Sequence, residues 1–271
     1  MESGRIALTV EDGVAHVELA RPDKMNAMDG AMFGAIGEMF RTLGTDGKVR
    51  AILLSGQGKH FTAGIDLHYA ASQFTPSEDH ARAGEARLRH IRWLQDCFTA
   101  LEEARAPVIA AIHGGCVGAG VDLATACDIR ICSADAYFQV AEVDVAITAD
   151  LGTLQRLIHL LPDGLVRELV FTGRRMDAEE AASTGLVNRI AADRDAAIAA
   201  GLEMARAIAA KSPVAVTGAK LSLNYSRGRT VAEGLGHVAL WNASALAAPD
   251  LMAAVQARLA KQDAHFAPLE D

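Results

Sequence analysis

The chain has 271 residues, of which 51% are hydrophobic, and its 34 acidic and 26 basic side chains give a net formal charge of −8. A chain of this length buries roughly three quarters of its unfolded surface, so it builds a full core without metal or disulfide staples. The acidic balance argues against non-specific nucleic-acid binding, which needs a basic surface. No apolar run approaches the ~20 residues of a membrane span. We therefore expect a globular protein of one or two domains that binds neither nucleic acid nor a membrane.

The chain carries no recognisable signal for export or lipid attachment. Its first residues lack a basic segment followed by an apolar one, and its last residues carry neither a lipidation motif nor a Ser-Lys-Leu peroxisomal address. The four cysteines have apolar neighbours and no Cys-x-x-Cys spacing; they are Cys97, Cys116, Cys127 and Cys132. This pattern is typical of reduced, buried thiols in a cytoplasmic protein, with a zinc site or a catalytic thiol as the alternatives.

The N-terminal two thirds of the chain alternate between strand-like and helix-like segments. Residues 5–10 and 14–19 are short β-type runs on either side of the turn residues 11–13, which predicts a hairpin. Asp29 has the position of an N-cap for a helix whose apolar residues recur at helical spacing from Met32 to Phe40.

Three later segments are apolar throughout and predict buried strands, at residues 50–54, 108–112 and 129–132. Between the first two, a polar stretch at residues 75–85 precedes a long helix that is expected to end at Glu103. Strands that are apolar on both faces and separated by helices indicate a largely parallel sheet covered by helices.

From residue 151 onward the pattern is mainly helical. Helical periodicity predicts four helices in this part, at residues 193–211, 215–226, 231–246 and 250–262. We therefore expect an α/β catalytic core over residues 1–195 and a helical region over residues 196–271.

Several common catalytic motifs are absent from the sequence. There is no P-loop, no Gly-x-Ser-x-Gly nucleophile elbow and no His-Glu-x-x-His, and the nine histidines are scattered without ligand spacing. His113, at the end of an apolar strand, is predicted to be a packed residue and not a ligand. These patterns give no support for a metal site or a serine nucleophile.

Two small-residue junctions follow predicted strands. Residues 114–120 (GGCVGAG) lie between the strand at 108–112 and a predicted helix at 121–126, and residues 60–67 (HFTAGIDL) follow the strand at 50–54. Backbone N–H groups exposed at such a junction suit a phosphate or a developing oxyanion. The alternatives are glycines that serve close packing in the first case and an ordinary turn in the second.

Three carboxylates stand among apolar neighbours: Asp122, Glu142 and Asp150. Desolvation raises the pKa of such a group toward values useful for proton transfer, and neighbouring carboxylates titrate as coupled groups. The alternative for each is a structural role as an N-cap or an ion-pair partner. Asp150 in particular directly precedes residues 151–157 (LGTLQRL) and has the position of an N-cap.

The chain also carries six motifs in a characteristic order, at residues 21–28 (RPDKMNAM), 61–67 (FTAGIDL), 107–114 (PVIAAIHG), 126–130 (ACDIR), 152–157 (GTLQRL) and 212–216 (SPVAV). Over residues 6–262 this order resembles the crotonase superfamily of enoyl-CoA hydratases and isomerases. The resemblance implies an α/β fold, a crotonase-like spiral of ββα units. It also implies a helical C-terminal region that builds homotrimers, often paired into hexamers.

Within that superfamily, residues 138–145 (FQVAEVDV), Asp150 and the tail segments at 225–227, 231–233 and 241–242 resemble the Δ3,5-Δ2,4-dienoyl-CoA isomerases. This likeness implies an enzyme of fatty-acid β-oxidation that converts 3,5-dienoyl-CoA to 2,4-dienoyl-CoA, with no cofactor beyond the CoA of the substrate. The alternatives are a 2-enoyl-CoA hydratase and, more distantly, a non-catalytic RNA-binding or scaffold member of the fold.

The resemblance implies a role for each site residue. Asp150 would take a proton from C2 of the acyl chain, Glu142 would return one near C6, and Asp122 would tune the field between them. The backbone N–H groups of Ile65 and Ala119 would bind the thioester oxygen, although Ala119 stands where the family usually has glycine.

The implied CoA and substrate contacts are Lys24, Met25, Ala27, Ala63, Gly64, Asp66 and Gly118. A lid region at about residues 69–87 has a mixed composition that does not specify the acyl chain length.

Overall fold

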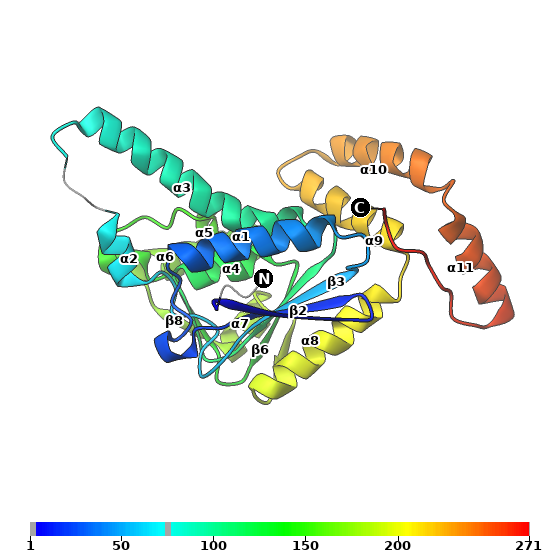
Figure 1. Cartoon of the computed structure of the whole chain (residues 1–271), viewed down its shortest axis with the longest axis horizontal. Coiled ribbons are helices and arrows are strands. Elements are labelled where there is room, and N and C mark those ends of the chain that lie inside the picture. Colours follow the sequence, from blue (N-terminus) through cyan, green and yellow to red (C-terminus); the bar gives the residue numbers. More distant parts are fainter. Residues whose placement is uncertain (1–3, 74–76, 271) are drawn as a thin grey trace.

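The computed structural model describes residues 4–73 and 77–270, and its strands and helices are seen in Figure 1. The strands are β1 (Ile6–Glu11), β2 (Val14–Leu19), β3 (Ala51–Gly56), β4 (Val108–Ile112), β5 (Gly115–Val117), β6 (Ile129–Ser133), β7 (Tyr137–Gln139), β8 (Arg175–Asp177) and β9 (Arg189–Ala191). The helices are α1 (Gly30–Thr45), α2 (Leu67–Ser72), α3 (His80–Glu103), α4 (Ala119–Ala126), α5 (Thr153–Leu157), α6 (Asp163–Thr172), α7 (Ala178–Thr184), α8 (Arg194–Ala209), α9 (Pro213–Ser226), α10 (Val231–Ala245) and α11 (Pro249–Ala260). Two 3-10 turns, η1 (Pro22–Lys24) and η2 (Glu142–Val145), complete the inventory.

The larger sheet has the strand order β1-β2-β3-β4-β6-β9. The first pair is the predicted antiparallel hairpin, and every later neighbour in the sheet is parallel. The predicted strands are thus confirmed. A second sheet, β5-β7-β8, was not predicted because each of its strands has only three residues, too few for a periodic pattern.

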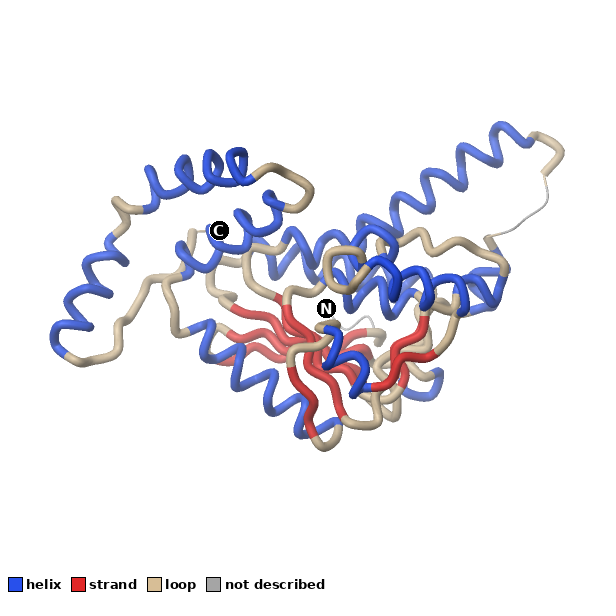
Figure 2. The backbone as a smooth tube through the Cα atoms, turned by 180° about the vertical axis from the view of Figure 1, so that it is seen from behind, coloured by secondary structure: helices blue, strands red, loops and turns tan. Residues whose placement is uncertain are grey.

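Both faces of the larger sheet are covered, as Figure 2 shows. In β3, Ile52 and Leu54 face the core beneath α1 and α3, whereas Leu53 belongs to a second cluster beneath α8. Strand β3 is therefore buried along its whole length, which is why it lacks the alternation of a half-exposed strand. The expected sheet covered by helices is confirmed.

Helix α1 begins where the sequence predicts it. The side chain of Asp29 accepts a hydrogen bond from the backbone N–H of Met32 at 2.9 Å and forms an ion pair with Arg5. The helix then buries Met32, Ile36 and Phe40 on one face.

Helix α3 ends at Glu103 as expected but begins at His80, inside the stretch predicted to be polar and non-helical. Asp79 caps it by accepting from the N–H of Arg82. The first turns of α3 project from the body of the molecule (Figure 1), so they have no apolar face for a periodicity analysis to detect. Residues 75 and 76 of the predicted polar stretch lie outside the described part of the chain.

The four predicted C-terminal helices are confirmed as α8 to α11. Helix α8 packs on the larger sheet through Ala197 and Ala205, whereas α10 and α11 extend away from the body and bury no residue fully (Figures 1 and 2). The division of the chain at residue 195 stays a prediction. Within residues 4–73 and 77–270, no single helix has the length and apolarity to cross a membrane; α10 and α11 reach both only together, and they are bent by 80°.

Helix α9 is fastened to the core by a buried lysine. The Lys220 ammonium lies 2.8 Å from a carboxylate oxygen of Asp128 and donates to the carbonyl oxygens of Leu101 and Ala106. The side chain of Lys220 is only 4% exposed and that of Asp128 is 21% exposed, so this ion pair is largely shielded from solvent.

We expect Lys220→Met to lower the free energy of unfolding by about 3 kcal/mol, because removing one partner of a buried pair leaves the Asp128 charge with only the hydrogen bond from the Val108 N–H. Urea unfolding followed by circular dichroism measures the change. Lys211→Met, at an exposed lysine just before α9, is the matched control. Equal stability of the two variants would contradict a fastening role for Lys220.

Candidate active site

The glycine-rich junction between β5 and α4 forms a sharp turn. Gly118 has φ 53° and ψ −120°, a conformation open in practice only to glycine, and α4 begins at the next residue. Ala119 is not among the residues with positive φ. The alanine at this position therefore carries no backbone strain, and its N–H is available at the first turn of the helix.

The second junction brings Ile65 beside this turn. The carbonyl of Gly64 accepts from the N–H of Met28, and the N–H of Asp66 donates to the carbonyl of Met28. In a parallel bridge of this kind the intervening residue, Ile65, turns its own N–H to the opposite side. A Cβ placed on Gly64 would lie 2.5 Å from the carbonyl oxygen of Val117 and 3.3 Å from the nitrogen of Ala119, so the two junctions are in direct contact.

Both N–H groups face a cavity. Ile65 and Ala119 line the same cavity, of about 1160 Å³, and within residues 4–73 and 77–270 neither N–H has a hydrogen-bond partner. Two unpaired backbone donors beside one cavity are the arrangement that stabilises a developing oxyanion.

The three predicted carboxylates also line this cavity. Its wall includes seven of the predicted site residues: Ala63, Ile65, Gly118, Ala119, Asp122, Glu142 and Asp150. Much of the remaining wall is apolar and comes from α2, α3 and the segment after β7, including Leu67, Ile91, Leu94, Val145, Ile147 and Leu151. The cavity therefore joins oxyanion donors, acids and an apolar lining that suits an acyl chain.

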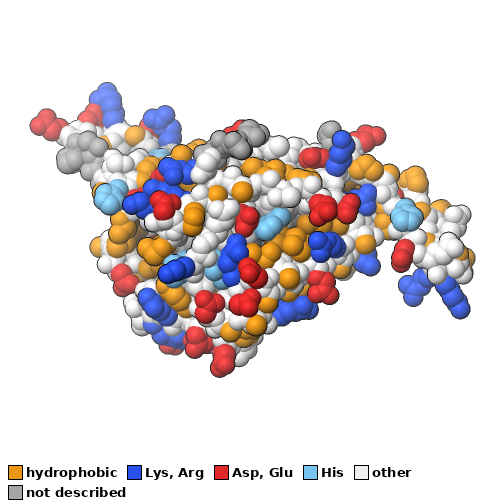
Figure 3. Space-filling model, turned by 60° about the horizontal axis from the view of Figure 1, so that its bottom comes forward, with side chains coloured by type: hydrophobic (Ala, Val, Ile, Leu, Met, Phe, Trp, Pro, Cys, Tyr) orange, Lys and Arg blue, Asp and Glu red, His pale blue; other side chains and the backbone are white. Residues whose placement is uncertain are grey.

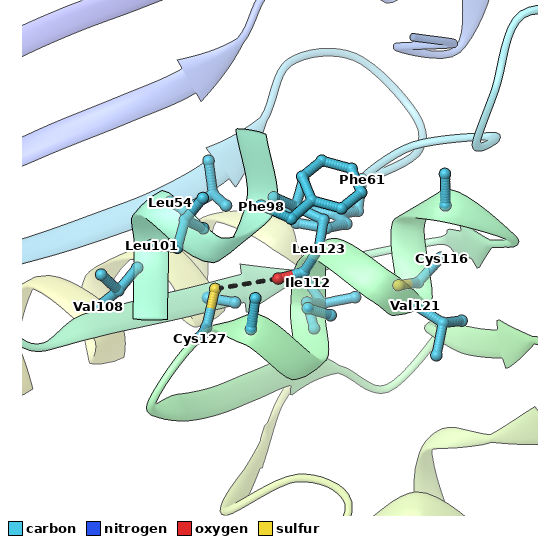
Figure 4. Packing of buried hydrophobic residues seen from close by; sticks show 14 of the residues in the cluster. Leu54, Phe61, Phe98, Leu101, Val108, Ile112, Cys116, Val121, Leu123 and Cys127 are labelled. Carbon is cyan, nitrogen blue, oxygen red and sulfur yellow. Dashed lines mark hydrogen bonds between the residues drawn. The ribbon is translucent and has the colours of Figure 1, made fainter. Parts of the chain in front are cut away.

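Asp122 lies in the first turn of α4, a helix whose apolar side chains pack into a dense core. The helix packs against Phe98 and Ile112, as Figure 4 shows, and Asp122 itself is 1% exposed. Its Oδ1 accepts a hydrogen bond from the backbone N–H of Thr153 at 2.5 Å. Burial raises the pKa of Asp122 to about 6, against the lowering effect of the Thr153 hydrogen bond and the Arg156 charge.

This hydrogen bond shows which carboxylate binds the N-terminus of α5. Thr153 is the first residue of α5, so the carboxylate that satisfies the N-terminus of this helix is Asp122 from a different helix. The residue at the N-cap position is Gly152, and Asp150 makes no capping bond. The N-cap alternative for Asp150 is therefore wrong.

Glu142 lies at the start of η2, directly over the glycine turn. Its Oε1 would be 3.4 Å from a Cβ on Gly118, and its Oε2 is buried without a hydrogen-bond partner among the described residues. Burial, together with the neighbouring Asp122 charge, raises the pKa of Glu142 to about 7. Glu142 can therefore hold a proton near neutral pH, unlike an ordinary exposed glutamate.

Asp150 is half-buried on the same cavity wall, and burial raises its pKa. Its backbone position is fixed from α3, because the Gln95 side chain donates to the Asp150 carbonyl oxygen at 2.6 Å. The three carboxylates are close enough to interact, since the charges of Asp122 and Asp150 both raise the pKa of Glu142.

The other predicted contacts lie outside the cavity wall: Lys24, Met25, Ala27, Gly64 and Asp66. Met25 lies beside a residue of the wall, because the N–H of Ala63 donates to its carbonyl oxygen, and Met25 is 52% exposed. Asp66 has a clear structural role, since it caps α2 and lies 2.8 Å from Arg21. Contact of these residues with CoA stays a prediction.

Two features of the site were not predicted from the sequence. Gln95 holds the Asp150 backbone, and the half-buried Arg156 guanidinium lies 2.9 Å from a carboxylate oxygen of Glu102 and also donates to the carbonyl oxygen of Leu151. Arg156 stands in the GTLQRL motif, which was the only available signal. Gln95 and Glu102 are on α3, whose sequence pattern marks them simply as a polar face.

The thiols and potential metal ligands form no further site in the described part of the chain. No group of three or more His, Cys, Asp or Glu side chains is arranged to hold a metal ion there. All four cysteines are buried and unpaired, and burial raises the pKa of Cys97 to about 11 and that of Cys127 to about 12. These thiols stay protonated at neutral pH.

The comparisons with known proteins agree with this architecture. The family model for enoyl-CoA hydratase/isomerase matches residues 9–266. A crystal structure of a putative enoyl-CoA hydratase from Streptomyces coelicolor superposes with a TM-score of 0.90 at 28% identity, covering 98% of this chain and 95% of that one. An enoyl-CoA hydratase from Bacillus anthracis superposes with a TM-score of 0.88 at 28% identity, covering 97% and 98%. The fold is therefore a crotonase fold, with two backbone N–H donors beside three carboxylates. The chain belongs to the enoyl-CoA hydratase/isomerase family.

Relatives with higher sequence identity have more specific names. The mitochondrial Δ3,5-Δ2,4-dienoyl-CoA isomerase of Rattus norvegicus is 48% identical over 253 residues, which cover 92% of this chain and 77% of the rat protein. The peroxisomal Δ3,5-Δ2,4-dienoyl-CoA isomerase of Arabidopsis thaliana is 43% identical over 267 residues, covering 97% and 96%.

Proposed function

We propose that this chain is a Δ3,5-Δ2,4-dienoyl-CoA isomerase of fatty-acid β-oxidation that acts on an acyl-CoA thioester. One observation carries the proposal. Three carboxylates, Asp122, Glu142 and Asp150, line a single largely apolar cavity beside two unpaired backbone N–H groups. The 43–48% identity to dienoyl-CoA isomerases over more than 90% of the chain supports the same reaction.

The reaction moves one proton out and one proton in. Asp150 takes a proton from C2, which breaks the C2–H bond and delocalises the electron pair from the thioester oxygen to C6. The N–H groups of Ile65 and Ala119 stabilise the negative charge on that oxygen. Glu142 then gives its proton to C6, so the double bonds shift from positions 3 and 5 to positions 2 and 4.

The positions of the acids suit this reaction better than hydration. Asp122 is engaged by the Thr153 N–H and lies near Arg156, so it acts as a fixed field between the other two. Asp150 stands where hydratases commonly have glycine, and it adds a third carboxylate to the acyl cavity. A proton acceptor and a proton donor are thus both available along one conjugated chain.

Mass spectrometry of the product separates the two activities. When purified protein is given 3,5-dienoyl-CoA, we expect a product of unchanged mass with a new ultraviolet absorbance, because the 2,4-diene is conjugated with the thioester carbonyl and the 3,5-diene is not. A hydratase would instead add the mass of one water to 2-enoyl-CoA. Hydration of 2-enoyl-CoA with no conversion of 3,5-dienoyl-CoA would overturn the proposal.

The alternative of an RNA-binding member has little surface support. On the face drawn in Figure 3, Lys and Arg side chains are interspersed with Asp and Glu, and no continuous basic stripe crosses this face. The net charge of −8 points the same way.

The assembly we propose is a homotrimer or a pair of trimers. The helices α10 and α11 expose large apolar side chains along their length, including Leu240 at 77% and Leu259 at 81%. Such a surface is typical of a protein–protein interface. We place the enzyme in the cytoplasm, whereas the rat and Arabidopsis relatives are named mitochondrial and peroxisomal.

The pH dependence of kcat/KM follows from the proton-donor role of Glu142. Because burial raises its pKa to about 7, the donor loses its proton as the pH rises through 7, and we expect kcat/KM to fall on that side. Protonation of the base Asp150 lowers the rate at acid pH. Rates measured from pH 5 to about pH 9 in Glu142→Gln should lose the alkaline limb. An alkaline limb that persists in this variant would assign the limb to another group.

A further inference from the structure

A second cavity lies behind Asp150. It measures about 410 Å³, and its wall is formed by α3, the segment before α5, α5 itself and Arg227. Asp150 and Leu151 line both this cavity and the acyl cavity, so this pair of residues separates the two. We call the second cavity the polar chamber.

The polar chamber differs from the acyl cavity in its chemistry. Its wall carries Gln95, Thr99, Glu102, Gln155, Arg156 and His159, all with polar side chains. Arg156 and Arg227 both form ion pairs with Glu102 there. Its volume exceeds many times the roughly 30 Å³ that one liquid water occupies, and polar groups of this kind are the partners that hold ordered water.

The residues that separate the cavities are fastened from the chamber side. Gln95 donates to the Asp150 carbonyl oxygen at 2.6 Å, and Arg156 donates to the Leu151 carbonyl oxygen at 3.2 Å. Both donors line the chamber. Two hydrogen bonds from the chamber wall therefore hold the segment that carries Asp150, in addition to the packing of Leu151 in the apolar core.

The proposed reaction leaves Asp150 protonated and Glu142 ionised, the reverse of what the next turnover requires. After one turnover Asp150 carries the proton from C2, and Glu142 has given its proton to C6. Before the next turnover, Asp150 must release one proton and Glu142 must gain one. At saturating substrate the acyl cavity is refilled by a new chain, which excludes water from that side of Asp150.

We propose that the polar chamber is the route by which Asp150 exchanges its proton with solvent. The O–H bond of the protonated Asp150 breaks, water in the chamber accepts the proton, and the carboxylate base is restored while the acyl cavity is occupied. Glu142, which lines only the acyl cavity, takes its replacement proton from solvent as the product leaves. Gln95 and Arg156 are positioning residues in this step, because they hold the Asp150 segment against the chamber. The inference rests on the proposed isomerase function.

The test is to fill the chamber without touching the acyl cavity. Thr99→Leu, on the α3 wall, adds apolar bulk to the chamber and lines no part of the acyl cavity. Gln155→Leu replaces a polar wall residue on α5 and serves as a second variant if the first folds poorly. Thr172→Leu is the matched control, because Thr172 is exposed on α6 and lines neither cavity.

The readout is the formation of 2,4-dienoyl-CoA in saturating 3,5-dienoyl-CoA, followed by stopped-flow absorbance. In the chamber variants we expect a first turnover at the wild-type rate, followed by a steady state slowed severalfold. That steady state should be slower still in D2O, which distinguishes a proton-transfer step from slow product release. The control should match the wild type in both phases.

Two results would overturn the inference. One is an unchanged steady state in both chamber variants, which would mean that Asp150 resets through the acyl cavity. The other is an equal loss in the first turnover and the steady state, as general disruption of the site produces. A wild-type protein without any isomerisation would instead remove the proposed function itself.

Discussion

Asp150→Asn is expected to lower kcat for the isomerisation of 3,5-dienoyl-CoA by about 10²- to 10⁴-fold, the usual contribution of a general base. Asparagine keeps the size of the side chain but does not accept the C2 proton at neutral pH. The half-buried position of Asp150 in the cavity wall means that the substitution changes little besides this chemistry. Because binding energy comes mainly from the CoA and the apolar lining, KM should change far less than kcat.

The matched control for this variant is Asp163→Asn, at an exposed aspartate at the start of α6 that lines neither cavity. Its turnover should equal that of the wild type. Binding of a non-reactive acyl-CoA, measured by calorimetry, should be nearly the same in all three proteins. Turnover close to the wild-type value in Asp150→Asn would show that another group removes the C2 proton.

Gly64→Ala is expected to lower kcat by about 10²- to 10³-fold through the oxyanion site. Gly64 has φ +87°, and a Cβ there would lie 2.5 Å from the carbonyl oxygen of Val117. The contact displaces the segment from Val117 to Ala119 relative to Ile65, and with it the Ala119 N–H. Loss of one such donor costs about 2.7–4 kcal/mol of transition-state stabilisation.

Gly84→Ala in α3 provides the comparison, because a Cβ at Gly84 meets nothing within 4 Å. Steady-state kinetics and thermal unfolding of both variants distinguish a loss of catalysis from a loss of stability. We expect Gly64→Ala to lose kcat while remaining folded, whereas Gly84→Ala keeps both activity and stability. Equal kcat in the two variants would mean that the spacing of the Ile65 and Ala119 donors does not limit the reaction.

The secondary structure of this protein was largely determined by local sequence. The hairpin of β1 and β2, the Asp29 cap and the buried strand β4 follow from turn residues, capping chemistry and apolar runs that act within a few positions of each other. The same holds for the C-terminal helices. The burial of Asp122 was foreseeable as well, because a lone carboxylate in an apolar helix has little chance of reaching solvent.

What the tertiary structure decided was which groups meet. Asp122 and the N-terminus of α5 are 31 residues apart in sequence, and only the fold shows that this carboxylate, and not Asp150, satisfies the helix. The start of α3 and the three-residue strands β5, β7 and β8 also escaped prediction, since they carry no periodic apolar face.

The polar chamber is likewise formed only by the tertiary structure. Its wall unites residues of α3 with residues around α5, and the Arg156–Glu102 pair within it spans 54 positions of sequence. Local patterns record which side chains avoid water and which backbone groups they cap. They carry no information about which distant segments become neighbours, and in this protein those neighbours decide how the acids are held, how their pKa values are set and what lies behind Asp150.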